Sequence, residues 1–329
     1  MEIHFKRFGI LLFFFCGFTS RAQQNDINLF VNDMLKIADD FASPAAEGAA
    51  YQAGAGWFTS AKSLELWEVD LSVHANVLLV PGKKKTNSVT SNDFATFDIR
   101  GAENAVIPSA FGGVTDVYFE GELNFMGNQV PFEFQALEGI DKDILMHPFV
   151  QASVGVPYGT DVIVRFLPQV EIDGVQFSTY GIGLKHNFNQ YFFNPQPEDF
   201  QFAALAAYTK FDVNYEFTPV IIDQVANLNE IEVDANLWLL QLITSKSFRN
   251  SGWSAIGSVG LTNSDFGYVV GGSGIALEPM NSALETLSNN EMEFKGDLGL
   301  TYETGNFLIN TMFSQGKFSN LNFSLHYKL

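Results

Sequence analysis

The chain has 329 residues, of which 17% are charged, 47% apolar and 14% aromatic, with 33 phenylalanines. Intrinsic disorder needs low hydrophobicity and a high density of charge, so this composition excludes it. Acidic residues outnumber basic ones by 37 to 18, the net charge is −19, and the sequence shows no basic stripe. This balance argues against nucleic acid as a partner.

Residues 1–22 have the three parts of a secretory signal peptide: a basic start, an apolar run at Ile10–Phe18 and small residues before a cleavage site at Ala22. The apolar run is too short to span a bilayer as a helix. Cleavage after Ala22 removes Cys16, the only cysteine, so we expect an exported chain without disulfides or thiol chemistry. The alternative is a buried N-terminal helix.

Residues 23–48 form the next predicted segment, which contains a helix from Asp26 to Phe41. Apolar residues recur there at spacings of three and four, which places them on one helix face: Ile27, Phe30, Val31, Met34, Ile37, Ala38 and Phe41. Pro44 is expected to end the helix. The helix either packs on the outside of a domain or plugs the lumen of a barrel.

The rest of the chain, residues 49–329, reads as one β domain. Apolar and polar residues alternate along its strands, most cleanly from Leu321 to Leu329, so that one face meets apolar surroundings and the other meets water. Turn signals at Asp173-Gly174, Asn263–Asp265 and Thr304–Asn306, and a long polar connection at Thr218–Glu230, divide it. We count about 14 strands, with 12 and 16 as alternatives.

A transmembrane antiparallel β-barrel explains this pattern better than a soluble β-sandwich. The strands exceed the five or six residues usual in globular proteins, and aromatic residues cluster near their ends, as at a membrane interface. The sequence stops at Leu329 inside an apolar alternation, which leaves an unprotected edge in water but pairs with the first strand in a closed barrel. We therefore expect the cell outer membrane, with outer-membrane lipid as a partner and the C-terminal strand presented to the barrel assembly machinery.

Three blocks, Gly159–Pro168, Tyr180–Asn187 and Ala53–Ala61, resemble an uncharacterised family of Bacteroidota-type outer-membrane proteins. At a coarser level the chain is similar to the FadL-like long-chain fatty-acid transporter group. That resemblance implies 14 strands around an N-terminal plug, with the helix Asp26–Phe41 as the plug. The Asn-Pro-Ala signature of the group is absent, because Ser43 stands in the place of its Asn.

The resemblance also implies a function and a site. The leading hypothesis is passive uptake of hydrophobic or amphipathic small molecules, with a ligand site near Phe30, Met34 and Phe41. Arg165 is a rare charge within the strands, and its position between Val164 and Phe166 predicts a lumenal side chain. It either pairs with a carboxylate from a facing strand or contacts the acid group of a substrate.

We predict no enzymatic activity. His186 with Ser178, or His326 with Ser324, are the only histidine–serine pairs worth weighing for an outer-membrane lipase, and neither forms a recognisable motif. No metal-binding or cofactor-binding spacing is found, so no catalytic residue, metal ligand or cofactor is assigned. The alternative to transport is a structural barrel whose loops, Asn189–Asp199 and Leu277–Asn290, bind a partner.

Overall fold

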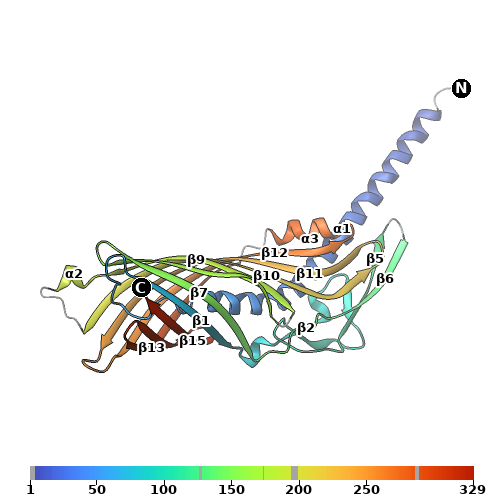
Figure 1. The fold of residues 1–329 in the computed structure, drawn as a ribbon. Coiled ribbons are helices and arrows are strands. Elements are labelled where there is room, and N and C mark those ends of the chain that lie inside the picture. The colour runs from blue at the N-terminus through green and yellow to red at the C-terminus, as the bar shows by residue number, and fades with distance from the viewer. Residues whose placement is uncertain (1–3, 126–127, 173, 194–198, 286–288) are drawn as a thin grey trace.

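A computed structural model describes residues 4–125, 128–172, 174–193, 199–285 and 289–329. Within them, ten antiparallel strands close into a barrel (Figure 1). β1 is bordered by β15 on one side and by β7 on the other, and every other barrel strand pairs with its neighbours along the chain. The ten are β1 (Val69–Leu79), β7 (Ile144–Val156), β8 (Thr160–Ile172), β9 (Val175–Asn187), β10 (Phe200–Ile222), β11 (Ala226–Ser247), β12 (Trp253–Ser273), β13 (Asn289–Thr304), β14 (Phe307–Gln315) and β15 (Ser319–Lys328).

The predicted all-β barrel is confirmed, but the predicted number of about 14 strands is wrong. β10, β11 and β12 are 23, 22 and 21 residues long, so each contains sequence that reads as more than one element. Asn263–Asp265, predicted as a turn, lies inside β12. Thr218–Glu230, predicted as a long connection, holds the end of β10, a tight turn and the start of β11.

The chain between β1 and β7 supplies the remaining short strands, and these lie outside the barrel. β2 (Thr86–Thr90) pairs with β4 (Asn104–Pro108), and β3 (Phe97–Ile99), β5 (Tyr118–Phe125) and β6 (Asn128–Gln135) form a second small sheet. Two short 3₁₀ turns, η1 (Gly82–Lys84) and η2 (Ser91–Asp93), precede β2 and β3.

The two ends of the barrel differ. We call the end that carries the small sheets and α3 (Leu277–Leu284) the extended end, and the opposite end, with α2 (Asn189–Phe192) and Leu329, the C-terminal end (Figure 1). None of the described helices is both long and apolar enough to cross a membrane.

Helix α1 (His4–Ala53) enters from the extended end and runs into the barrel (Figure 1). It extends beyond the predicted Asp26–Phe41, and Pro44, which was expected to end it, lies inside it. A proline cannot donate to the carbonyl four residues earlier. Here the Asp40 carbonyl accepts a hydrogen bond from the side-chain amide of Asn87 instead.

The next carbonyl is also satisfied by the chain between β1 and β7. The backbone N–H of Ala110 donates to the carbonyl of Phe41 at 2.9 Å. Pro44 removes only the donor to the Asp40 carbonyl, and the helix continues past it because Asn87 supplies that hydrogen bond from outside.

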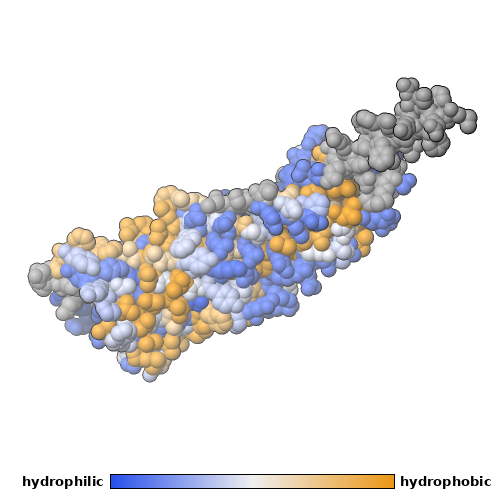
Figure 2. Space-filling view, turned by 90° about the horizontal axis from the view of Figure 1, so that it is seen from above, coloured by the Kyte–Doolittle hydropathy of each residue, from blue (hydrophilic) through white to orange (hydrophobic). Residues whose placement is uncertain are grey.

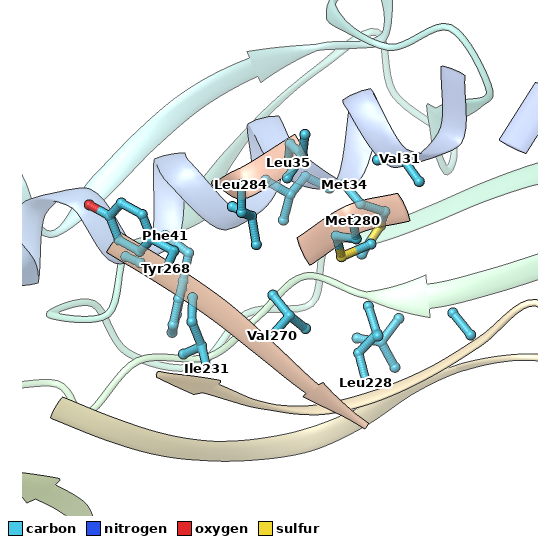
Figure 3. Packing of buried hydrophobic residues seen from close by; sticks show 14 of the residues in the cluster. Val31, Met34, Leu35, Phe41, Leu228, Ile231, Tyr268, Val270, Met280 and Leu284 are labelled. Atoms are coloured by element: carbon cyan, nitrogen blue, oxygen red, sulfur yellow. The ribbon is translucent and has the colours of Figure 1, made fainter. Parts of the chain in front are cut away.

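The main hydrophobic core lies at the extended end rather than in the middle of the barrel. Side chains of α1 pack there against α3 and the inner faces of β11 and β12 (Figure 3). The labelled members are Val31, Met34, Leu35, Phe41, Leu228, Ile231, Tyr268, Val270, Met280 and Leu284. The apolar face of α1 predicted from the sequence is thus buried inside the protein.

The outer wall of the barrel carries an apolar belt. Exposed apolar residues alternate with buried ones along β14, and the same alternation runs through its neighbours. On the face seen in Figure 2, apolar side chains gather toward the C-terminal end, and hydrophilic ones predominate beyond them, with smaller apolar patches near the extended end. Tyr208 and Trp238, whose ring centroids are 4.9 Å apart, lie at the border of the belt that is nearer the extended end. Asp212 and Asp234 lie beyond this border and face outward.

The last strand closes the barrel as the sequence predicts. β15 pairs with β1 from Asp70↔Lys328 to Leu79↔Ser319. The backbone of Leu329 continues the ladder through hydrogen bonds with Val69 of 2.8 and 3.4 Å. The apolar edge that would be hazardous in water is therefore paired.

Candidate binding pocket

A largely apolar pocket of about 410 Å³ lies between the inner half of α1 and the barrel wall, a size in the range of small-molecule sites. Small alanines on one face of α1 leave the space, and aliphatic and aromatic side chains of β7, β9, β10 and β11 surround it. The lining residues are Phe41, Ala42, Ala45, Ala46, Ala49, Gln52, Ala53, Ala110, Phe111, Ile140, Lys142, Ile144, Leu145, Met146, His147, Val175, Phe177, Ser178, Thr179, Phe211, Val213, Tyr215, Ile231 and Val233.

The pocket lies beside an interruption in the barrel wall, which we call the β7–β8 gap. The pairing between β7 and β8 runs only from Val150↔Phe166 to Val156↔Thr160. In the described part of the chain, Ile144–Phe149 of β7 pair with β1 alone, while the end of β8 follows β9 after a register shift between Leu167 and Val170.

Proline chemistry explains why the two strands separate there. Pro148 lies in the part of β7 that pairs with β1 alone, and Pro168 lies at the register shift of β8. Proline has no N–H to donate to a neighbouring strand, so it is confined to strand edges and bulges. The gap thus exposes two stretches of backbone that a fully paired barrel would hide.

The gap brings the pocket to the outer surface. Ile144 and Met146 line the pocket, yet they are 50% and 59% exposed on the outer face of β7. On the other side of the gap, Phe166 is also exposed, and its ring lies 5.4 Å from that of Tyr180. Apolar side chains therefore lie on both sides of the opening, while Gln169 and Gln176, bonded to each other at 2.9 Å, add exposed polar groups on β8 and β9.

His147 lines this apolar space with a largely buried ring. Its ring lies between those of Phe149 and Phe177, at centroid distances of 5.5 and 5.8 Å. Nε2 is 2.9 Å from the hydroxyl of the buried Thr179, while the buried Nδ1 has no hydrogen-bond partner among the described residues. A buried nitrogen without a partner is costly.

Other polar groups of the pocket are already engaged. The Gln52 amide donates to the carbonyl of Leu145 at 3.0 Å, and the Tyr215 hydroxyl donates to the carbonyl of Glu138 at 3.0 Å. The Ser178 hydroxyl lies 3.3 Å from a carboxylate oxygen of Asp212. His147 therefore differs from Gln52, Tyr215 and Ser178 in having a buried nitrogen without a hydrogen-bond partner.

Arg165 lies deeper in the lumen and anchors the end of α1. Its guanidinium donates to the carbonyls of Ala53 and Ala55, both at 2.9 Å, and to the side chain of Gln151. The rings of Trp57 and Phe149 face it at 4.1 and 3.9 Å. A cation is favourable at a helix C-terminus, so this buried charge is matched by backbone dipoles and aromatic faces.

The segment after α1, residues 54–64, fills the lumen toward the C-terminal end. Lys295 donates to the carbonyl of Gly54 at 2.8 Å, and Lys185, ion-paired with Asp161 at 2.9 Å, donates to the carbonyls of Ser60 and Lys62. Inward-facing polar side chains of the wall thus satisfy backbone groups that have no strand or helix partner. We call residues 54–64 the plug segment.

Two glycines of β9 make room for the plug segment. The ring of Trp57 lies against Gly181 and Gly183, where a Cβ atom would come within 2.8 and 3.0 Å of it. The same indole donates to the carbonyl of Ala53 at 3.2 Å. These glycines therefore serve close packing of the ring on the wall.

The structure brings only one of the four predicted ligand-binding residues to the pocket. Phe41 lines it and stacks on Tyr215 at 6.0 Å. Phe30 packs on Phe132 of the small sheet at 5.7 Å, and Met34 belongs to the core at the extended end. Arg165 bonds to the end of α1 rather than to a carboxylate. No alternation pattern distinguishes His147 from other lumenal histidines, so sequence reasoning did not select it.

The two histidine–serine pairs have different outcomes. His186 bonds to Thr160 at 2.8 Å, so it is not paired with Ser178. His326 lies 2.9 Å from the Ser324 hydroxyl through Nε2 and 2.9 Å from Asp70 through Nδ1. All three are buried in the lumen wall, beside a second pair of Ser72 and His74 at 2.9 Å.

These hydrogen-bonded side chains of β1 and β15 make this part of the lumen wall polar. His74 stacks on Phe149 and contacts the amide of Asn322, which in turn donates to Asn76 at 2.7 Å. Across the described ranges of the chain, no group of three or more His, Cys, Asp or Glu side chains is arranged to hold a metal ion.

Comparison with known proteins identifies the family. Residues 1–329, the whole chain, match a family described as "Family of unknown function (DUF6588)". The chain belongs to the DUF6588 family. A search of curated proteins finds no match.

Solved structures similar to the DUF6588 chain are outer-membrane β-barrels. The autotransporter NalP translocator domain of Neisseria meningitidis is 9% identical, with a TM-score of 0.35, and the match covers 90% of this chain and 97% of that one. The attachment invasion locus protein Ail of Yersinia pestis is 9% identical, with a TM-score of 0.27, and the match covers 80% of this chain and 99% of that one. An outer membrane channel of Pseudomonas putida F1 is 9% identical, with a TM-score of 0.26, and the match covers 82% of this chain and 97% of that one.

Matches this distant say nothing about what the DUF6588 chain does. Its architecture rests on its own strand pairing, whose ten strands differ from the 14 that the FadL-like resemblance implies. A FadL-like role and a Bacteroidota origin stay predictions.

Proposed function

We propose that this protein is an outer-membrane barrel that takes up a hydrophobic or amphipathic small molecule passively, from the membrane rather than from water. The observation that supports the proposal is the β7–β8 gap, which joins the apolar pocket to the apolar outer wall. A molecule dissolved in lipid reaches the pocket past the exposed apolar side chains of Ile144 and Met146.

The membrane location rests on the outer face of the barrel. A soluble protein rarely exposes apolar side chains on strand after strand around its whole wall. The belt on β10 runs from Phe200 to Tyr208, close to the ~9–11 residues that a tilted strand needs to cross a bilayer. A closed barrel also leaves no backbone group unpaired in lipid, except at the gap.

Passage beyond the pocket requires movement of the plug segment. Residues 54–64 and the end of α1 block the lumen toward the C-terminal end through the contacts of Arg165, Lys185 and Lys295. Binding is therefore the first step, and release follows when these polar contacts rearrange. No enzymatic step, metal or cofactor is part of the proposal.

The test closes the gap. Met146 and Gln169 are both exposed, on the β7 side and the β8 side of the gap, so a Met146→Cys/Gln169→Cys pair, joined by a short bis-maleimide, bridges the opening. An Ala152→Cys/Val164→Cys pair in the paired part of the same two strands is the matched control. Both are made with Cys16→Ser and reconstituted in lipid vesicles.

A decane carrying a photoreactive diazirine is the probe. We expect it to label residues 41–53 and 144–149 in the unbridged protein and in the bridged control, but not when the bridge spans the gap. Equal labelling with the gap bridged would contradict entry from the membrane.

The alternative is a structural barrel whose loops bind a partner, and the filled lumen favours it. Of the two loops predicted for this role, residues 194–198 and 286–288 lie outside the described residues. Under this alternative, replacing either loop abolishes partner binding, while the diazirine labels the pocket weakly or not at all.

A further inference from the structure

We infer that the ligand of the pocket is an N-acyl amino acid, whose amino-acid part pairs with the backbone of Met146 as a residue of a neighbouring strand would. This inference rests on the proposed function, because it assumes that the pocket binds an apolar or amphipathic molecule from the membrane. It goes further by naming the chemical class of that molecule and the part of the wall that recognises it.

The first step is that the edge of β7 faces the pocket. The four consecutive residues Ile144–His147 all line it. Side chains alternate between the two faces of a strand, and here Ile144 and Met146 are exposed on the outer face while His147 is buried. Residues of both faces border one space only where the edge of the strand, with its backbone groups, is turned toward that space.

The second step is which backbone groups this edge presents. The backbones of Gly155 and Asp143 hydrogen-bond to the residues that flank β1, on the other side of β7. Successive residues of a strand point their N–H and C=O groups to opposite sides. The register of β7 with β1 runs without a shift, so Ile144 and Met146 point theirs away from β1 and into the gap.

The third step is that these groups have no partner in the described part of the chain. The pairing of β7 with β8 begins only at Val150↔Phe166, and no described residue hydrogen-bonds to the N–H or C=O of Ile144 or Met146 across the gap. Pro148, the next residue with this orientation, presents only its carbonyl. In lipid, which lacks water, a backbone group without a partner is costly. Met146 therefore offers one donor and one acceptor to a ligand.

An amino-acid residue supplies the two matching groups. Directly opposed residues of antiparallel strands exchange two hydrogen bonds, each N–H donating to the C=O of the other residue. A single trans amide cannot do this, because its N–H and C=O point in opposite directions. The pocket has the size of a small-molecule site, and its lining is chiefly alanine, aliphatic and aromatic, so an acyl chain on the nitrogen completes the ligand.

The experiment measures competition for the diazirine-decane label in the full chain reconstituted in vesicles. The matched competitors are N-decanoylalanine methyl ester and O-decanoyl-lactic acid methyl ester, which differ only in having N–H or oxygen at one position. At equal mole fraction in the membrane, we expect the alanine compound to compete about tenfold more strongly, the value of one hydrogen bond to a partner shielded from water. Equal competition would overturn the inference.

Met146→Pro tests the other hydrogen bond, because it removes the N–H of the edge and keeps the carbonyl. It should weaken competition by the alanine compound about tenfold and leave competition by decane unchanged. Val106→Pro is the matched control, on an exposed residue of β4 that also lies two positions before a proline and points its N–H away from the paired strand. It should leave both competitors unchanged. The comparison of the two esters in the wild-type chain covers the case in which Met146→Pro does not assemble.

The outcomes separate this inference from the function that it rests on. Undiminished competition by the alanine compound in Met146→Pro would overturn the role of the β7 edge and leave the pocket intact. Stronger competition by N-decanoyl-trialanine methyl ester than by the single-residue compound would assign the edge to an acylated peptide and overturn the small-molecule class. Absence of labelling of the pocket by diazirine-decane would instead defeat the proposed function itself.

Discussion

At the scale of single residues, Arg165 shows how a buried charge is accommodated without a carboxylate. Its donors complete the C-terminal end of α1 at Ala53 and Ala55, and its faces are covered by two aromatic rings. Arg165→Met should lower the free energy of unfolding by about 2–3 kcal/mol, because the Ala55 carbonyl loses its donor and the Ala53 carbonyl keeps only the indole of Trp57. Urea unfolding in detergent micelles measures the change.

Arg165→Lys should recover little of that loss, because an ammonium cannot reach both carbonyls with the geometry of a guanidinium. Arg100→Lys, at the exposed pair with Glu133, is the control and should change stability by less than about 1 kcal/mol. Full recovery in Arg165→Lys would show that charge alone is needed.

The packing of Trp57 against Gly181 and Gly183 gives a second prediction at this scale. Gly181→Ala places a methyl group 2.8 Å from the indole and should cost about 1–3 kcal/mol. Gly257→Ala, where the nearest atom is 3.7 Å away, should be nearly neutral. Adding Trp57→Leu to Gly181→Ala should relieve the clash, so the two changes together cost less than their sum. Additive costs would contradict the close packing.

At the scale of elements, α1 depends on the chain between β1 and β7. Asn87 donates to the carbonyl of Asp40, which Pro44 leaves without its usual partner. Asn87→Ala should cost about 1 kcal/mol in the wild-type chain and clearly less when Pro44→Ala restores a backbone donor. A double-mutant cycle on urea unfolding measures this coupling, and a coupling of zero would refute it.

The elements also show what sequence patterns can and cannot predict. The period of two and the pairing of Leu321–Leu329 with the first strand followed from alternation, because side-chain direction is local. The lengths of β10–β12 and the continuation of α1 past Pro44 did not, because both depend on partners distant in sequence. The β7–β8 gap depends on a register shift, which alternation alone cannot reveal.

The candidate site follows the same division. Arg165 was predicted to face the lumen and does, while its partners Ala53 and Ala55 lie more than a hundred residues away in sequence. Phe41 was predicted from a helical stripe that also contains Phe30 and Met34. Which of the three borders a pocket depends on the side chains that pack against each of them, and these come from distant parts of the sequence.

At the scale of the whole molecule, the apolar belt predicts how the barrel responds to charge on its surface. Val259→Arg, on the exposed outer face of β12, should destabilise the barrel by about 2–4 kcal/mol in a bilayer. Glu232→Arg, outward on β11 beyond the belt, should be close to neutral. Folded fractions follow from gel mobility before and after boiling, and equal effects of the two changes would contradict a membrane-embedded belt.

The central claim is that the pocket is open to the hydrocarbon of the membrane and closed to water. A nitroxide on Phe177→Cys, in a Cys16→Ser background in vesicles, tests it most directly, with Leu240→Cys and Glu232→Cys as lipid-facing and water-facing references. We predict that oxygen, which concentrates in lipid, relaxes the label at 177 strongly and that a water-soluble nickel complex does not. Strong relaxation by the nickel complex, or by neither agent, would contradict the account.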